Sequence, residues 1–152
     1  MIKLYRADAA SGHKLIALAA KELCGADNAL VLRTELGKPY FAELDIKFSL
    51  SHSGERAILA VSEKEIGADI QIMRPISLGV AKRFFTEKEQ AYVLGADGEE
   101  ARLVRFYEVW TKKEAYGKWD GGGLSAALKC DVTELDFYTE CDGEYAIAIY
   151  EK

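Results

Sequence analysis

A seven-residue stretch, residues 66–72, places the strongest constraint on the fold. Isoleucine or alanine stands at every second position, and Gly67, Asp69 and Gln71 stand between them. This alternation predicts a β-strand with one apolar face and puts Asp69 and Gln71 together on the other face. A carboxylate among aliphatic residues needs a charged partner or a metal if it is buried, whereas one at an exposed strand end needs neither. The pattern alone leaves both interpretations of Asp69 open.

Other periodic segments predict helices interleaved with strands. Thr86 and Glu89 have the spacing of a capping box, so a helix is expected to start at Glu87. The remaining predicted elements are a helix over 9–23 ending before Gly25, strands over 46–50 and 57–61, a helix over 77–85, a long helix over about 101–118 closed by glycines 121–123, and strands over 135–139 and 145–150 around Asp142-Gly143. These elements predict an α+β fold with mostly antiparallel sheets. We expect two successive halves, residues 1–73 and 74–152, in one compact unit.

Composition narrows the class of protein. The chain has 152 residues, 49% of them hydrophobic, which is enough for a core that needs no disulfide or structural metal. Its net charge of −5 argues against nucleic acid as a partner. The three cysteines, Cys24, Cys130 and Cys141, lack the spacing of a zinc site or a disulfide framework. No apolar run is long enough for a signal peptide or a membrane span, so we expect a cytoplasmic protein.

The long helix carries the most suggestive spacing. Trp110, Glu114 and Lys118 recur every four residues and therefore share one helical face, with Lys113 beside it. Taken alone, this pattern is also typical of a solvated helix with a Glu–Lys ion pair. The segments Gly37-Lys38-Pro39 and 51–54 (Ser-His-Ser-Gly) are likewise compatible with ordinary polar turns. No single motif decides the function.

The order of these motifs is more informative than any one of them. The series is Gly37-Lys38-Pro39, Phe48-Ser-Leu-Ser-His-Ser53, Ile66-Gly-Ala-Asp-Ile70, Arg83-Phe-Phe85, Trp110-x-x-Lys-Glu114-x-x-x-Lys118 and Gly-Gly-Gly-Leu124. Together they resemble the surfactin-synthetase-activating type of 4′-phosphopantetheinyl transferase, over residues 13–124. The resemblance implies a pseudo-dimeric fold of two similar α/β halves. In the small trimeric holo-acyl-carrier-protein synthases the Asp strand lies near the start of the chain, whereas Asp69 is in the middle.

The resemblance implies roles for particular residues. Asp69 and Glu114 match metal carboxylates, with Gln71 where a third is common, and Glu114, Lys118 and Asp69 are the implied catalytic residues. The implied coenzyme A contacts are Lys14, Lys38, Ser51, His52, Lys113 and Lys118. Residues 1–73 would form the coenzyme A side and residues 74–152 would carry the metal and the catalytic helix. Lys14 stands where the family usually has arginine, and Gly122 where it usually has lysine.

The reaction implied by the resemblance is Mg²⁺-dependent transfer of 4′-phosphopantetheine from coenzyme A to a serine of an apo acyl- or peptidyl-carrier protein. Glu114 would accept the serine proton. The carrier could serve fatty-acid, polyketide or nonribosomal-peptide synthesis, and the protein is expected to be a shortened member of the family, a monomer or weak dimer. The alternatives are a degenerate homologue that binds coenzyme A or carrier protein without catalysis, favoured by Gln71, and an α+β interaction module with a fortuitous match.

Overall fold

The protein is described by a computed structural model that covers all residues, 1–152. Its helices are α1 (Lys14–Cys24), α2 (Gly79–Phe84), α3 (Glu87–Leu94), α4 (Glu99–Asp120) and α5 (Leu124–Ala127), with 3₁₀ turns η1 (Ala9–Ser11) and η2 (Val132–Glu134). Its strands are β1 (Lys3–Asp8), β2 (Val31–Arg33), β3 (Pro39–Phe41), β4 (Lys47–Ser53), β5 (Arg56–Ser62), β6 (Ile66–Ile72), β7 (Tyr138–Asp142) and β8 (Tyr145–Glu151). None of the helices combines the length and the apolar character needed to cross a membrane.

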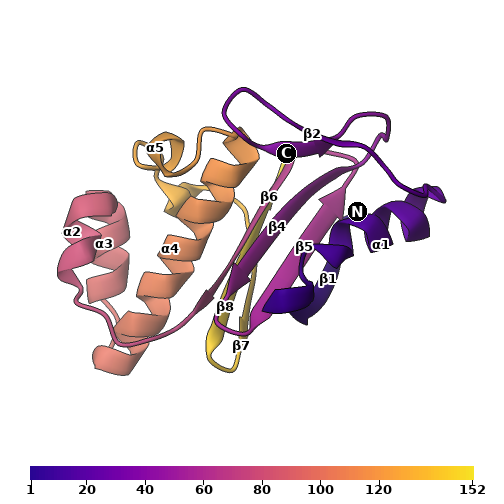
Figure 1. Cartoon of the computed structure of the whole chain (residues 1–152). Coiled ribbons are helices and arrows are strands. Elements are labelled where there is room, and N and C mark those ends of the chain that lie inside the picture. Colours follow the sequence, from indigo (N-terminus) through magenta and orange to yellow (C-terminus); the bar gives the residue numbers. More distant parts are fainter.

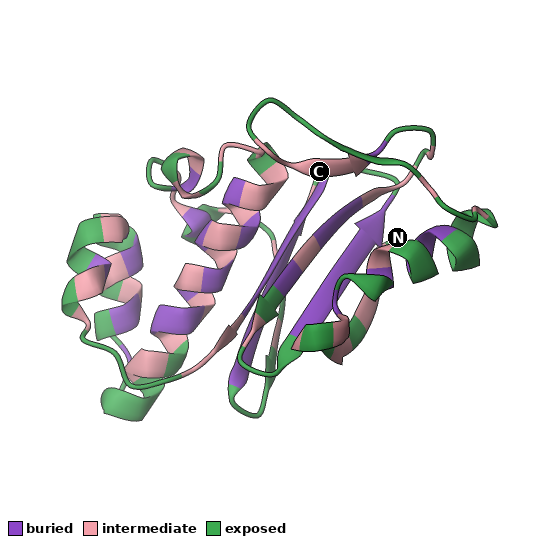
Figure 2. Cartoon of the chain, viewed as in Figure 1, coloured by how far each residue is buried: buried purple, intermediate pink, exposed green.

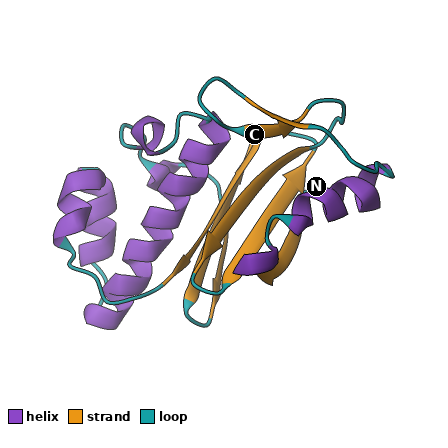
Figure 3. Ribbon diagram, viewed as in Figure 1, coloured by secondary structure: helices purple, strands orange, loops and turns teal.

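Two three-stranded antiparallel sheets form the centre of the molecule (Figure 3). The strand order is β1-β5-β4 in one sheet and β6-β8-β7 in the other, and β2 and β3 form a separate hairpin. Figure 1 shows α1 on one side of the sheets and α4 on the other, with α2 and α3 beyond α4. This arrangement confirms the predicted α+β class with antiparallel sheets.

The two larger sheets meet along their edge strands β4 and β6, where serine side chains replace a backbone ladder. Three serines spaced two residues apart on β4 accept hydrogen bonds from backbone N–H groups of β6. The pairs are Ser49 with Ala68 at 2.9 Å, Ser51 with Ile70 at 3.2 Å and Ser53 with Ile72 at 3.0 Å. An edge strand otherwise leaves its N–H groups unpaired, so these serines satisfy β6 and fix its register against β4.

Helix α4 lies directly on β6 because a glycine permits the close approach. A Cβ at Gly67 would lie 2.0 Å from the Ala115 carbonyl oxygen. On the same helix, Gly117 packs against the glycine-rich turn after α4, where a Cβ would lie 2.3 Å from the Gly123 oxygen. These contacts bring the C-terminal part of α4 next to the strand that carries Asp69. Figure 2 shows that buried residues concentrate in the central strands and recur along α4.

The structure corrects several predicted boundaries. The predicted helix over 9–23 is divided into η1 and α1, α4 is longer at both ends than residues 101–118, and β7 starts at Tyr138 rather than at residue 135. Strand β1 and the short β2–β3 hairpin lack a clear apolar alternation and were not predicted. Strand β6 precedes the expected boundary at residue 73, yet it pairs with β8. The division into two halves stays a prediction.

Candidate functional site

Asp69 is the centre of a small polar cluster at the junction of β4, β6 and α4. Its side chain is only 3% exposed. One oxygen, Oδ1, accepts hydrogen bonds from Ser51 Oγ and Lys118 Nζ, each at 3.0 Å. The other, Oδ2, accepts one from Gln71 Nε2 at 3.0 Å. The predicted strand face therefore exists, and the structure brings Asp69, Gln71, Ser51 and Lys118 together.

Glu114 stands one helical turn before Lys118 and is half-buried, with no hydrogen-bond partner for its carboxylate. Burial raises its pKa above the ordinary value, the negative charge of Asp69 raises it further, and Lys118 opposes both effects. Burial also raises the pKa of Asp69, against the opposing influence of Lys118, Gln71 and Ser51. Asp69 and Glu114 thus share the positive charge of Lys118. When both carboxylates are ionised, the cluster carries one negative charge more than the lysine neutralises.

This donor set could hold a divalent cation with help from a ligand. No group of three or more His, Cys, Asp or Glu side chains is arranged around one point. Mg²⁺, however, is commonly held by one or two carboxylates together with substrate phosphates and water. Asp69 and Glu114 offer two carboxylates that both feel the charge of Lys118, and the Gln71 amide oxygen is a further neutral ligand. The residues therefore fit Mg²⁺, provided that phosphate oxygens complete its coordination.

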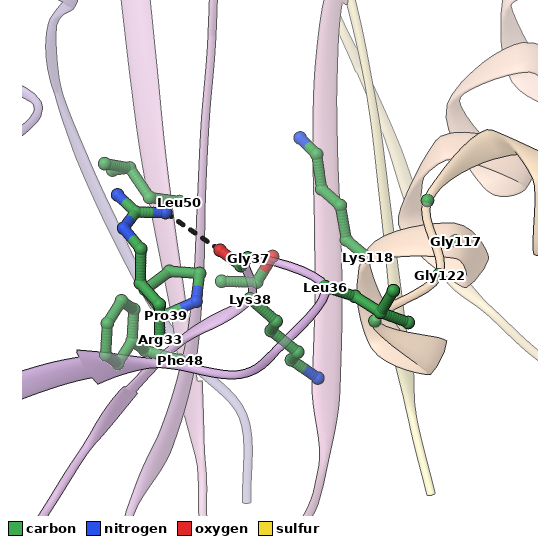
Figure 4. A pocket seen from close by; sticks show the side chains of 13 residues that line it. Arg33, Leu36, Gly37, Lys38, Pro39, Phe48, Leu50, Gly117, Lys118 and Gly122 are labelled. Atoms are coloured by element: carbon green, nitrogen blue, oxygen red, sulfur yellow. Dashed lines mark hydrogen bonds between the residues drawn. The ribbon is translucent and has the colours of Figure 1, made fainter.

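A cavity of about 400 Å³ opens beside this cluster, between the β2–β3 hairpin, β4 and the C-terminal end of α4 (Figure 4). Its lining contains three cations, Arg33, Lys38 and Lys118, and no acidic residue. Leu36, Pro39, Phe48 and Leu50 supply apolar surface, and glycines 117 and 121–123 form the opposite wall. A basic cavity with apolar walls on a chain of net charge −5 suits an anionic ligand with an aromatic or aliphatic part.

Lys38 connects two walls of this cavity. Its amine donates to Glu65 at 2.9 Å and to the carbonyl oxygen of Trp119, near the end of α4, at 2.8 Å. In Figure 4 the Lys38 amine points away from Arg33 and Lys118. Lys38 therefore lines the cavity with its stem, while its charge is neutralised by Glu65 and holds the β2–β3 turn against α4.

Lys113 does not join the cavity residues, although it immediately precedes Glu114. Its side chain is fully buried and its amine donates to Glu89 at 2.8 Å and to the Cys130 carbonyl oxygen at 2.9 Å. Glu89 also accepts from the backbone of Thr86 and Val132, at 2.9 Å and 2.8 Å. This ion pair fastens α3, α4 and η2 together. A phosphate could not reach the Lys113 amine in this arrangement, which speaks against the predicted contact with coenzyme A.

Three other predicted contacts lie outside the cavity lining. Ser51 is buried and bonded to Asp69, so it orients the carboxylate. His52 and Lys14 are exposed side chains, the first on β4 and the second at the start of α1. Gly12, close to Lys14 in sequence, packs against Ala57, which pairs with His52, so His52 and the start of α1 lie near the same end of the first sheet.

Sequence reasoning missed Arg33 and the partner of Lys113. Arg33 lies in a three-residue strand with no periodic pattern, and no motif marked it. Glu89 was recognised only as the acid of a capping box, which the structure confirms. Glu89 also pairs with Lys113. Helical spacing could have indicated this, because Glu89 lies one turn before Val93 on the buried face of α3, and a buried carboxylate requires a cation.

Comparison with known proteins adds an independent finding. Residues 65–152 match the model of the 4′-phosphopantetheinyl transferase superfamily. The 4′-phosphopantetheinyl transferase Sfp of Bacillus subtilis (strain 168) is 43% identical over 95 residues, covering 62% of this chain and 42% of that protein. A second 4′-phosphopantetheinyl transferase of Bacillus subtilis is 40% identical over 120 residues, 77% of this chain and 53% of the relative. The 4′-phosphopantetheinyl transferase HetI of Nostoc is 38% identical over 103 residues, 63% of this chain and 43% of the relative. The chain spans about half the length of these curated relatives.

Proposed function

The chain belongs to the 4′-phosphopantetheinyl transferase superfamily, and on that premise we propose that it transfers 4′-phosphopantetheine from coenzyme A to a serine of an apo carrier protein. The observation that carries the proposal is the junction of Asp69, Glu114 and Lys118 beside a basic cavity of about 400 Å³. Coenzyme A combines an adenine, a pyrophosphate and a phosphomonoester. Its base matches the apolar walls of the cavity, and its phosphates match the cations.

In the proposed reaction the serine oxygen bonds to the phosphorus on the pantetheine side of the pyrophosphate. The bond from that phosphorus to the bridging oxygen breaks, and 3′,5′-adenosine bisphosphate leaves with its electron pair. Mg²⁺, when bound by Asp69 and Glu114, would supply charge neutralisation at the pyrophosphate. Lys118 donates to a phosphate oxygen in place of Asp69, and this exchange leaves Asp69 free to act as a ligand.

The proposed base for the serine proton is Glu114. A base is most effective when its pKa lies near the working pH, and both burial and Asp69 raise the pKa of Glu114 in that direction. The lack of a hydrogen-bond partner leaves the carboxylate available to a hydroxyl or to a bridging water. Binding of Mg²⁺ by the same carboxylate would lower its basicity. Acceptance of the serine proton therefore requires a Glu114 oxygen that is not bound to the cation.

The remaining parts of the proposal concern the setting of the reaction. Residues 1–73 would supply the cavity walls of β4 and the β2–β3 hairpin, and residues 74–152 would supply α4. We expect the protein to work in the cytoplasm as a monomer or weak dimer, with carrier protein and coenzyme A as partners and without nucleic acid or membrane.

A second candidate function, binding of coenzyme A or carrier protein without transfer, is favoured by Gln71. Its amide donates to Asp69 and brings no charge to the place where a third metal carboxylate is common in the family. The cluster therefore has fewer anionic ligands than a three-carboxylate site. Two carboxylates are nevertheless sufficient for Mg²⁺ when phosphates complete the coordination, so transfer remains the first proposal.

Incubation of the protein with coenzyme A, Mg²⁺ and an apo carrier protein separates the two functions. Mass spectrometry of the carrier is expected to show the added phosphopantetheine, and the product is expected to disappear with Asp69→Ala. Lys82→Ala, an exposed substitution outside the cavity lining, provides a control for handling and folding. Tight binding of coenzyme A by a folded wild type that never modifies any apo carrier would favour the non-catalytic candidate.

A further inference from the structure

The two three-stranded sheets are linked into a closed ring beside Asp69. Within each sheet, neighbouring members of the ring are paired strand to strand. One gap between the sheets is bridged by the Ser51 hydroxyl, which accepts the Ile70 N–H at 3.2 Å. The other gap, between the edge strands β1 and β7, is bridged by Arg6, which donates to the two carboxylate oxygens of Glu140 at 2.6 and 2.7 Å. The order around the ring is Arg6, Ile58, Ser51, Ile70, Ile147 and Glu140.

A similar ring recurs two residues further along β4 and β6. Ser53 accepts the Ile72 N–H at 3.0 Å, and across the opposite gap Arg56 donates to Asp142 at 2.7 Å. Strand pairing joins Arg56 to Ser53 and connects Ile72 to Asp142 through Tyr145, whose ring centre lies 4.5 Å from the Arg56 guanidinium carbon. Ion pairs opposite the serines are therefore a repeated feature of the junction between the sheets.

The interior of the first ring is incompletely packed, so its ion pair contributes more to closure than apolar contacts alone would suggest. A cavity of about 470 Å³ lies between the sheets, and Arg6 and the three isoleucines of the ring are among the residues that line it. Exposed ion pairs usually contribute little, but a bidentate contact between arginine and a carboxylate is an exception. The Glu140 side chain is 26% exposed, and the hydrogen bonds from Arg6 lower the pKa of its carboxyl below the ordinary value. The pair therefore stays charged near neutral pH.

We propose that Arg6 and Glu140 are positioning residues for Asp69. The Ser51 hydroxyl accepts the Ile70 N–H and also donates to Asp69 Oδ1, at 3.0 Å. Both bonds require β6 to stay in place against β4. Because β6 is tied to β7 through β8, an ion pair that fastens β7 to the first sheet limits the motion of β6 away from Ser51. The consequence for catalysis rests on the proposed function, in which Asp69 is a ligand of Mg²⁺.

The first test is backbone amide hydrogen exchange, followed by NMR on the folded proteins. Glu140→Gln keeps the shape of the side chain and removes its charge. We expect the exchange rate of the Ile70 N–H to rise about threefold or more relative to the amides of the central strand β5, which report global unfolding. The charge-swapped protein, Arg6→Glu with Glu140→Arg, is expected to recover part of the wild-type protection.

Glu22→Gln is the matched control. Glu22 pairs with Lys3, a cation on the same strand β1 whose side chain is about as exposed as that of Arg6. This ion pair joins β1 to α1 and leaves the gap between β1 and β7 unchanged. The variant is expected to keep the wild-type exchange rate at Ile70.

The second test is the Mg²⁺ dependence of transfer. In Glu140→Gln the Mg²⁺ concentration for half-maximal transfer is expected to rise about threefold, because Asp69 is held less firmly, and the KM for carrier protein is expected to stay unchanged. The charge-swapped protein should move the Mg²⁺ midpoint back toward wild type, which a general loss of stability would not explain.

The outcomes separate this inference from the proposed function. Unchanged exchange at Ile70 in Glu140→Gln, or an equal rise in Glu22→Gln, overturns the positioning role and leaves the transfer reaction intact. Faster exchange at Ile70 with an unchanged Mg²⁺ midpoint overturns the link to Asp69. Faster exchange confined to Glu140→Gln, in a protein whose wild type modifies no carrier, supports closure of the ring by the ion pair and overturns the transfer reaction.

Discussion

Lys113 and Lys118 lie on the same helix and match lysines of the same implied role, yet the structure puts them in opposite environments. The Lys113 amine is sealed with Glu89 and both side chains are 0% exposed, whereas Lys118 is 32% exposed at the edge of the cavity, beside Asp69. The Lys113–Glu89 pair is closed to solvent. Lys118 is partly exposed, so its amine can leave Asp69 and donate to a phosphate instead. The difference teaches that a lysine in a family motif can fasten its helix to neighbouring elements through a buried carboxylate.

The largest expected effect is on stability at the sealed pair. Lys113→Met leaves the Glu89 carboxylate buried without its cation, and removing one partner of such a pair typically costs about 3–5 kcal/mol. Urea denaturation should show this loss in the free energy of unfolding, and Glu89→Gln in the same chain should recover part of it. Lys112→Met, one residue away in an ion pair that is only partly buried, is the control and should cost clearly less than Lys113→Met. Equal losses at both positions would contradict the distinction.

The next effect concerns the open pair and appears in function. Lys118→Ala removes a charged donor to phosphate, worth about 1.5–3 kcal/mol, so we expect the KM for coenzyme A to rise about tenfold or more. Its effect on stability should be smaller than that of Lys113→Met, because Lys118 is partly solvated and the pKa of Asp69 is already raised by burial, which eases protonation of the carboxylate when the lysine is removed. Steady-state kinetics and thermal unfolding measure the two quantities. A rise in KM confined to the carrier protein would place Lys118 at the protein interface instead.

A third prediction uses the raised pKa of Glu114. If Glu114 is the base, kcat/KM should rise with pH through a pKa above the ordinary value for glutamate. Lys118 lowers the pKa of Glu114, so Lys118→Gln should move this rise in kcat/KM to still higher pH. Stability should change in the opposite sense. The folded state holds the proton more tightly than the unfolded state, so the contribution of Glu114 falls as pH rises from its ordinary pKa to its raised one. Glu114→Gln should flatten that part of the stability profile, and a profile identical to wild type would exclude the shift.

The smallest expected effect concerns the neutral ligand beside Asp69. Gln71→Glu adds an anionic group worth on the order of 1 kcal/mol even when it is well screened. The Mg²⁺ concentration for half-maximal transfer should therefore fall several-fold, and Asp69→Asn should raise it. Gln71→Ala, which adds no charge, serves as the control and should not lower the midpoint. Identical Mg²⁺ midpoints for wild type and Gln71→Glu would place Gln71 away from the cation.

The sequence was sufficient to predict the parts of the site that depend on local periodicity. Alternation over residues 66–72 placed Asp69 and Gln71 on one strand face, and the structure shows their side chains in contact. Helical spacing put Glu114 and Lys118 on one side of α4. Lys118 donates to the Asp69 carboxylate, and the charge of Asp69 raises the pKa of Glu114. These relations lie within a few residues of each other, so the period of the backbone fixes them.

The parts that sequence reasoning missed depend on contacts between distant segments. Helical spacing shows that Lys113 lies beside the face of Glu114, but only the packing of α3 shows that Glu89, which is 24 residues earlier, occupies that side. Ser51 was assigned to coenzyme A from the family resemblance alone. The serine ladder between β4 and β6, which adds a structural task for Ser51, became visible only in the structure. Arg33 depends in the same way on how the β2–β3 hairpin folds over the end of α4.

The contrast between the two lysines is tested most directly by coenzyme A binding to Lys113→Met and Lys118→Met, measured by calorimetry under conditions where circular dichroism shows both variants folded. These substitutions remove the same charge from the same helix, five residues apart. We expect the folded Lys113→Met protein to bind coenzyme A within about twofold of wild type, and Lys118→Met to bind about tenfold or more weakly. Equal weakening of the two folded variants would contradict the account, because it would mean that Lys113 leaves Glu89 to contact the ligand.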